Sequence, residues 1–105
     1  MTQPCIILAT LKPAAGKKDA VLAVFEEVVP AVHEEKGCEL YALYEDVDGA
    51  LHMIEKWTSW DLWQVHMAGA PVAAIQSGLE GLLESDVLIE EMYGLNVGLE
   101  GKAAL

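Results

Sequence analysis

A change of hydrophobic period near residue 58 constrains the fold of this chain more than any other feature. Residues 50–57 follow the period of two that is typical of a strand, whereas the apolar residues after Thr58 recur at helical spacing. Thr58 and Asp61 resemble a capping box in which Asp replaces Glu, a pattern that marks a helix start. The sequence therefore predicts that a strand ends and a helix begins at Thr58.

This predicted helix carries a histidine in the middle of an apolar arc. At about 100° per residue its polar face consists of Asp61 and Gln64. A titratable ring among apolar residues is either a core histidine with a hydrogen-bond partner, the more frequent case, or the polar group of a pocket. The sequence leaves both interpretations open. The residues of the apolar arc are Leu62, His66, Trp63, Met67 and Trp60.

The rest of the chain divides into short strands and helices. Strands are predicted at residues 4–11, 38–47, 50–57 and 86–96, with a tight turn at Asp48-Gly49. Helices are predicted for residues 17–35, from Thr58 onward, and for residues 72–83. Pro30 lies inside the first helix and is expected to kink its last turns. Residues 1–96 are predicted to form a single domain, and residues 97–105 a loose tail.

This element order, β-α-β-β-α-α-β, predicts an α+β fold of the ferredoxin-like kind, with a four-stranded antiparallel sheet and helices on one face. Such a sheet normally has one apolar face and one polar face. In the first strand, however, Ile6 and Leu8 point to one face while Ile7 and Ala9 point to the other. Because both faces then require burial, we predict a homodimer that packs sheet against sheet.

The charge balance argues against polyanionic partners. The chain has 6 basic and 17 acidic residues, a net charge of -11, and no cluster of basic residues. A nucleic acid or an anionic membrane surface would therefore be repelled. Cys5 and Cys38 are isolated, which gives neither a metal site nor a disulfide framework. Without a signal peptide or a membrane-spanning segment, a cytoplasmic location is expected.

Several short motifs, taken in order, resemble the antibiotic biosynthesis monooxygenase family. The resemblance covers about residues 5–95 and is strongest to the small quinol monooxygenases of bacteria. It implies a dimeric α+β barrel. The motifs are Pro13-Ala14-Ala15-Gly16-Lys17, Val29-Pro30, Glu35-Lys36-Gly37-Cys38 with Tyr41, Glu55-Lys56-Trp57, and His66.

The resemblance also implies an oxygenase that needs no cofactor and uses O2 as co-substrate. A quinol, anthrone or similar aromatic molecule would lose a proton, pass an electron to dioxygen and leave as a quinone. In this reading Trp57 and Tyr41 donate hydrogen bonds to the substrate oxyanion, and His66 is the base or a further donor. The walls for a flat aromatic ligand would be Phe25, Trp60, Trp63 and Met67, although three of these at helical spacing are also typical of a core.

The chain departs from the family pattern in two places. Pro71 is followed by Val72, where many members carry a second histidine, so His66 would act alone. Residues 6–8 lack the Asn that the haem-degrading branch uses, which disfavours haem oxygenation. The alternatives are a non-catalytic small-molecule-binding or stress-response protein, or an isomerase of a small metabolite. His66 in a cavity beside Trp57 would favour catalysis, whereas His66 buried against a backbone partner would favour binding.

Overall fold

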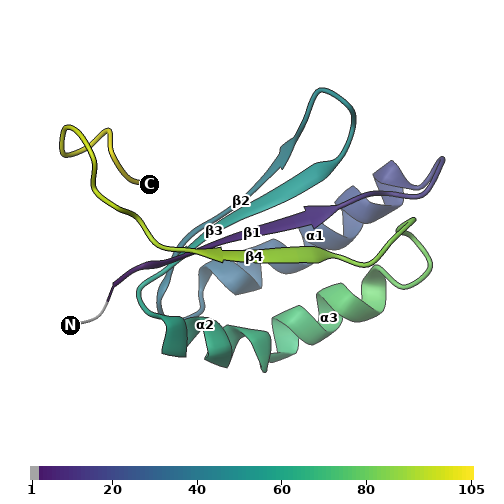
Figure 1. The fold of residues 1–105 in the computed structure, drawn as a ribbon. Helices are drawn as coiled ribbons and strands as arrows, with labels where there is room; N and C mark the ends of the chain where they lie inside the picture. Colours follow the sequence, from purple (N-terminus) through teal and green to yellow (C-terminus); the bar gives the residue numbers. More distant parts are fainter. Residues whose placement is uncertain (1–2) are drawn as a thin grey trace.

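In the computed structural model, which describes residues 3–105, three helices cover one face of a four-stranded antiparallel sheet (Figure 1). The strand order is β2-β3-β1-β4, with each neighbouring pair antiparallel, which confirms the predicted ferredoxin-like α+β fold. Met1 and Thr2, which the predicted domain includes, lie outside the described residues. The strands are β1 (Cys5–Leu11), β2 (Cys38–Glu45), β3 (Leu51–Trp57) and β4 (Leu88–Met92), and the helices are α1 (Lys18–His33), α2 (Trp60–Met67) and α3 (Ala70–Gly78).

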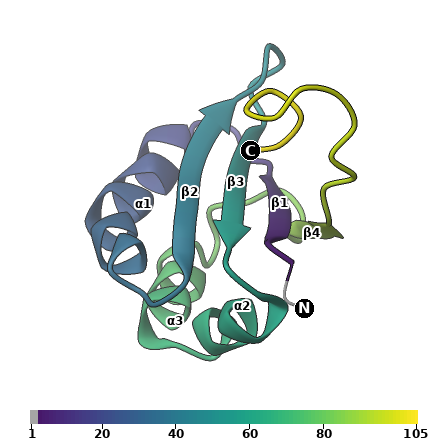
Figure 2. The same cartoon turned by 90° about the vertical axis from the view of Figure 1, so that its left-hand side faces the viewer.

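The pleat of the central strands sorts their side chains between two environments. β1 and β3 pair in a register that sets Ile7 opposite Glu55 and Ala9 opposite Met53. Alternate residues of both strands are buried, because successive side chains of a strand point to opposite faces. The helices lie against this buried face, as the view turned by 90° shows (Figure 2). The core therefore occupies the layer between sheet and helices.

The opposite face of the sheet also carries apolar side chains, among polar ones such as Lys56 and Glu90. In β4, Leu88 and Met92 pair with Thr10 and Ile6 of β1 and remain 57% and 42% exposed. Leu8, in the centre of that face, is half-buried. This is the surface through which the sequence predicts a dimer.

Helix α2 begins one residue later than predicted. Its N-cap is Ser59, whose hydroxyl accepts a hydrogen bond from the Leu62 N–H at 3.2 Å. Thr58 instead belongs to the end of the sheet, since its N–H donates to the Gly37 carbonyl at 2.9 Å and its hydroxyl donates to Glu39. The predicted change from strand to helix is confirmed, but Thr58 is hydrogen-bonded to Gly37 and Glu39, just beyond the end of β3, and Ser59 is the cap instead.

The other elements are shorter than predicted or shifted. β4 ends at Met92 rather than residue 96, and α1 ends at His33 rather than residue 35. α3 begins at Ala70 with Pro71 in its first turn, where the missing proline N–H leaves no helical hydrogen bond unmade. At the other end of α3, Gly78 permits close packing on α1, because an added Cβ would lie 2.8 Å from a Val24 methyl group.

The segment after β4 turns back so that the C-terminus lies near β3 (Figure 2). Residues 93–105, all within the described range, contain turns but neither helix nor strand. The ammonium of Lys56 donates to the Leu105 carbonyl oxygen at 2.6 Å. Leu95, Val97 and Leu99 of this segment are exposed. Among the described residues, no helix is long and apolar enough to cross a membrane.

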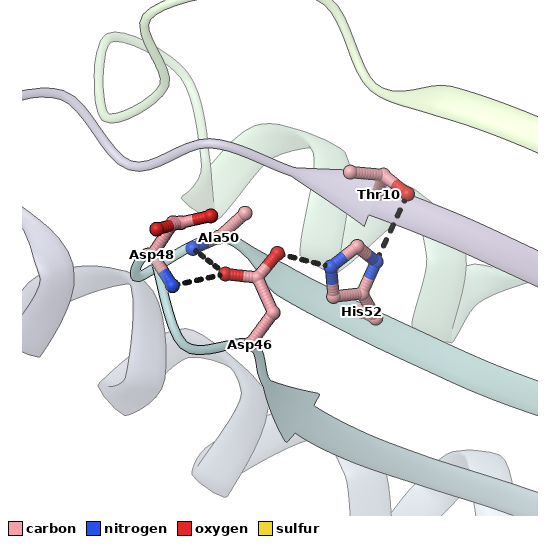
Figure 3. Close-up of polar contacts among 5 residues, drawn as sticks. All are labelled: Thr10, Asp46, Asp48, Ala50 and His52. Atoms are coloured by element: carbon pink, nitrogen blue, oxygen red, sulfur yellow. Dashed lines mark hydrogen bonds and ion pairs between the residues drawn. The ribbon is translucent and has the colours of Figure 1, made fainter.

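The hairpin between β2 and β3 is closed by side chains (Figure 3). Asp46 Oδ1 accepts hydrogen bonds from the N–H groups of Asp48 and Ala50 at 2.9 and 3.1 Å. Asp46 Oδ2 lies 2.8 Å from His52 Nε2, and His52 Nδ1 lies 3.1 Å from the Thr10 hydroxyl of β1. The hydrogen bond with His52, followed by that from Asp48, lowers the pKa of Asp46. These contacts tie the hairpin to the neighbouring strand.

Candidate active site

A cavity of about 510 Å³ lies between the sheet and the helices. This volume falls within the range of small-molecule sites, about 300–1,000 Å³. Its walls are largely apolar and include Leu11, Phe25, Met53, Ile75 and Leu79. Three buried polar side chains interrupt these walls, namely Tyr41, Glu55 and His66.

Glu55 is a carboxylate on the core face of β3. It alternates with Met53 and Trp57, so the pleat that buries these apolar neighbours also buries Glu55, which is 5% exposed. The Trp57 indole N–H donates to Glu55 Oε1 at 2.9 Å. Burial raises the pKa of Glu55 to about 7, against the opposing effect of the indole hydrogen bond and with a smaller contribution from Glu35. This carboxyl group can therefore gain or lose a proton near neutral pH.

His66 connects two carboxylates. Its Nδ1 lies 2.8 Å from Glu35 Oε2, and its Nε2 lies 4.0 Å from Glu55 Oε1. An ionised carboxylate can only accept, so contact with an ionised Glu35 places a proton on Nδ1. In the neutral ring the Nε2 atom, which faces Glu55, is then the nitrogen that can accept a proton or a hydrogen bond. Glu35 thus fixes the orientation of the imidazole.

Tyr41 completes the polar part of the wall from the neighbouring strand β2. Its ring packs edge-on against His66, with centroids 5.5 Å apart, and against Trp57 at 6.4 Å. Burial, followed by the charges of Glu55 and Glu35, raises the pKa of Tyr41. The phenol therefore stays neutral at physiological pH and keeps its O–H as a donor.

The structure brings most of the predicted site residues together, but not all of them line the cavity. His66, Tyr41, Phe25 and Met67 line the cavity. His66 also lies beside Trp57, with ring centroids 4.4 Å apart, the arrangement that the sequence analysis linked to catalysis. Trp57 itself is fully buried, is not among the residues that line the cavity, and donates its N–H to Glu55.

Two predicted wall residues lie outside this cavity. Trp60, at the first position of α2, is 45% exposed, and its indole N–H donates to Glu91 of β4 at 3.2 Å. Trp63 is buried one turn further on but is not among the cavity residues. Helical spacing alone placed both beside His66, whereas the packing of α2 leaves only His66 and Met67 at the cavity.

Sequence reasoning missed the two carboxylates. For Glu55 a signal existed, because a charged residue at the buried parity of an alternating strand needs a special environment. Glu35 stands in the family motif Glu35-Lys36-Gly37-Cys38, but that motif does not indicate its contact with His66, which lies 31 positions further along the chain. Within residues 3–105, no group of three or more His, Cys, Asp or Glu side chains is arranged to hold a metal ion.

Comparisons with known proteins agree with this architecture. The family model for antibiotic biosynthesis monooxygenases matches residues 4–78. The candidate monooxygenase Rv0793 of Mycobacterium tuberculosis is 32% identical over 60 residues, 56% of this chain and 59% of that protein, so the match spans less than two thirds of its length. The structure of Rv0793 superposes with a TM-score of 0.79 at 23% identity, over 85% of this chain and 92% of that one. PA3566 of Pseudomonas aeruginosa gives a TM-score of 0.81 at 28% identity, over 90% and 97% of the two chains.

Proposed function

Because the chain belongs to the antibiotic biosynthesis monooxygenase family, we propose that it is a cofactor-independent oxygenase of quinols, anthrones or similar aromatic molecules. The observation that carries this proposal is the pair of buried residues His66 and Glu55 at the wall of an apolar cavity, with Glu35 hydrogen-bonded to His66 from outside that wall. An apolar cavity accepts a flat aromatic ring, and the buried group provides for proton transfer inside it.

The first step is removal of a proton from the substrate. His66 Nε2 takes this proton while Glu35 stabilises the imidazolium, which is the role of a carboxylate behind a catalytic histidine. A phenol with a pKa of about 10 lies about 3 pKa units above neutral pH, so its ionisation there costs about 4 kcal/mol. One well-placed donor to an oxyanion is worth about 3–4 kcal/mol. The neutral Tyr41 hydroxyl, on the same wall, supplies such a donor.

Oxygen chemistry then proceeds on the substrate anion. The anion passes one electron to dioxygen, and the substrate radical combines with superoxide to form a C–O bond and a peroxide. The peroxide O–O bond breaks with loss of water, and the carbon that carried hydrogen becomes a carbonyl. The proton removed in the first step returns to the departing oxygen, so each turnover consumes one O2 and releases one water. Glu55, with a pKa of about 7, provides a second group through which this proton passes.

Association as a homodimer is part of this proposal. The apolar sheet face that includes Ile6, Leu8, Leu88 and Met92 supports sheet-against-sheet packing, which would give a dimeric α+β barrel. Light scattering at micromolar concentration should report twice the 11.4 kDa chain mass. A monomer would refute the dimer but leave the site on one subunit intact.

Oxygen uptake is the test of the activity. The protein, treated with chelator, is mixed with a panel of dihydroquinones and anthrones, and oxygen consumption is compared with the autoxidation blank. We expect uptake above the blank, reduced by 10- to 1,000-fold in His66→Ala. Glu26→Gln, an exposed change on α1, serves as the unaffected control. Ligand binding without uptake would support the binding-protein alternative, and conversion without oxygen consumption would support an isomerase.

A further inference from the structure

The titratable side chains that line the cavity are mostly acidic. Glu80, Glu84 and Asp86 are exposed, belong to the segment between α3 and β4, and line the cavity where it meets solvent; we call them the acidic mouth. Glu55 adds a further carboxyl group on the buried wall. Among residues 3–105, neither Lys nor Arg lines the cavity. The electrostatic potential at the entrance is therefore negative.

Among the described residues, no lysine forms an ion pair with a carboxylate of the acidic mouth. Lys12 adjoins the mouth through its backbone, where its carbonyl accepts a hydrogen bond from the Glu84 N–H at 2.9 Å. The lysines that form ion pairs in the described chain do so elsewhere, Lys18 with Glu45 and Lys56 with Glu39. The net charge of -11 adds a long-range field of the same sign. An anionic ligand would lose hydration on entering a region that also repels it.

We propose that the acidic mouth selects aromatic ligands with a positively charged substituent, so that the substrate class is an amine-bearing phenol or quinol. This inference rests on the proposed function for the identity of the ring. The hydroxyl end enters the apolar cavity toward Tyr41 and His66, and the ammonium remains at the mouth near Glu80, Glu84 and Asp86. The cation keeps much of its hydration there while it interacts with three carboxylates.

The size of the selection follows from Coulomb's law. A unit charge about 8 Å from one carboxylate in water changes an affinity about twofold, and three carboxylates at low ionic strength give about fivefold after screening. A cationic ligand should thus bind about fivefold more tightly than its neutral analogue, and an anionic one about fivefold more weakly. At 0.5 M salt the Debye length is roughly 4 Å and most of this preference disappears.

The test measures binding rather than turnover. Titration calorimetry under nitrogen, at about 10 mM and 0.5 M ionic strength, compares 4-(2-aminoethyl)phenol, 4-ethylphenol and 3-(4-hydroxyphenyl)propanoate. The mouth variant Glu80→Gln/Glu84→Gln/Asp86→Asn is compared with Glu26→Gln/Glu27→Gln/Glu34→Gln, which removes equal charge from exposed positions outside the cavity. We expect the mouth variant to lose the order cation, neutral, anion while retaining its affinity for 4-ethylphenol, and the control variant to keep that order.

Each contrary result identifies a different fault. Equal affinity for all three ligands, or an equal change in both variants, would overturn the proposal. A preference for the cation that survives in the mouth variant but is lost in Glu55→Gln would also overturn it, because the charge would then sit at the buried wall. Charge selection without oxygen uptake would leave the selection standing and refute only the oxygenase. Oxygen uptake with no charge selection would leave the oxygenase standing and refute the selection by the acidic mouth.

Discussion

Glu55→Gln should change how stability depends on pH, in a direction opposite to that of most carboxylates. The native pKa of Glu55 is raised from 4.5 to about 7. Between these values the folded protein holds a proton that the unfolded chain has lost, so the free energy of unfolding falls as pH rises. The loss begins near pH 4.5, is complete somewhat above pH 7, and is absent in the variant. The Gln carbonyl still accepts the Trp57 N–H in place of the carboxylate.

The magnitude follows from the size of the pKa shift. A shift from 4.5 to about 7, at 1.36 kcal/mol per unit, corresponds to about 3 kcal/mol. Relative to the wild type, Glu55→Gln should therefore gain about 3 kcal/mol in unfolding free energy between pH 4.5 and pH 8. Other titrating groups cancel in this difference, apart from those that interact with Glu55, namely Glu35 and His66.

Urea unfolding followed by tryptophan fluorescence, at fixed protein concentration across this pH range, measures the difference. Glu26→Gln, on the exposed face of α1, should run parallel to the wild type at every pH. If the Glu55→Gln curve also ran parallel, Glu55 would have an ordinary pKa, and its assignment as a proton-transfer group would fail. A variant that lost stability relative to the wild type as pH rose would show an ionised, stabilising carboxylate instead.

Three further expectations concern the scaffold. Ser59→Ala should lower the free energy of unfolding by about 1 kcal/mol through loss of the α2 cap, as measured by urea unfolding; no change would remove the cap assignment. Gly78→Ala should be destabilising by about 1 kcal/mol, because its Cβ meets Val24, and Val24→Ala should relieve this, as thermal melts would show; a stabilised single variant would contradict the close packing. His52→Phe should raise the pKa of Asp46 toward its ordinary value, as measured by carboxyl NMR titration; an unchanged pKa would assign the shift to the backbone donors.

Much of the fold could be predicted because local pattern and global topology agree. The alternation in β3 and the helical period after it follow from local sequence, and a hairpin between β2 and β3 leaves few ways to order the strands. Element ends were less predictable, since Thr58 could either cap a helix or extend a sheet. The backbone pairing of Thr58 with Gly37 favoured the sheet, and this contact joins distant parts of the chain.

The site was only partly visible in the sequence. His66 and Tyr41 were accessible through the family resemblance, and both lie at the cavity. The environment of His66 was not accessible, because Glu35 reaches it from the connection between α1 and β2. Trp57 shows the same limit: its residue type predicts a donor, but only the structure identifies Glu55 as the acceptor.

Strand β3 serves two surfaces with successive residues. Glu55 lies at the cavity, while Ile54 and Lys56 on either side of it point to the opposite face of the sheet. Neighbouring residues of β3 are thus subject to different selective pressures. The ligand acts on the residue at the cavity, and the partner of the outer face acts on the residues beside it. Side chains on opposite faces of the strand barely touch. A substitution on one face therefore leaves the other face nearly undisturbed. Relatives with this strand can therefore diverge in ligand and in assembly independently, within the same seven residues.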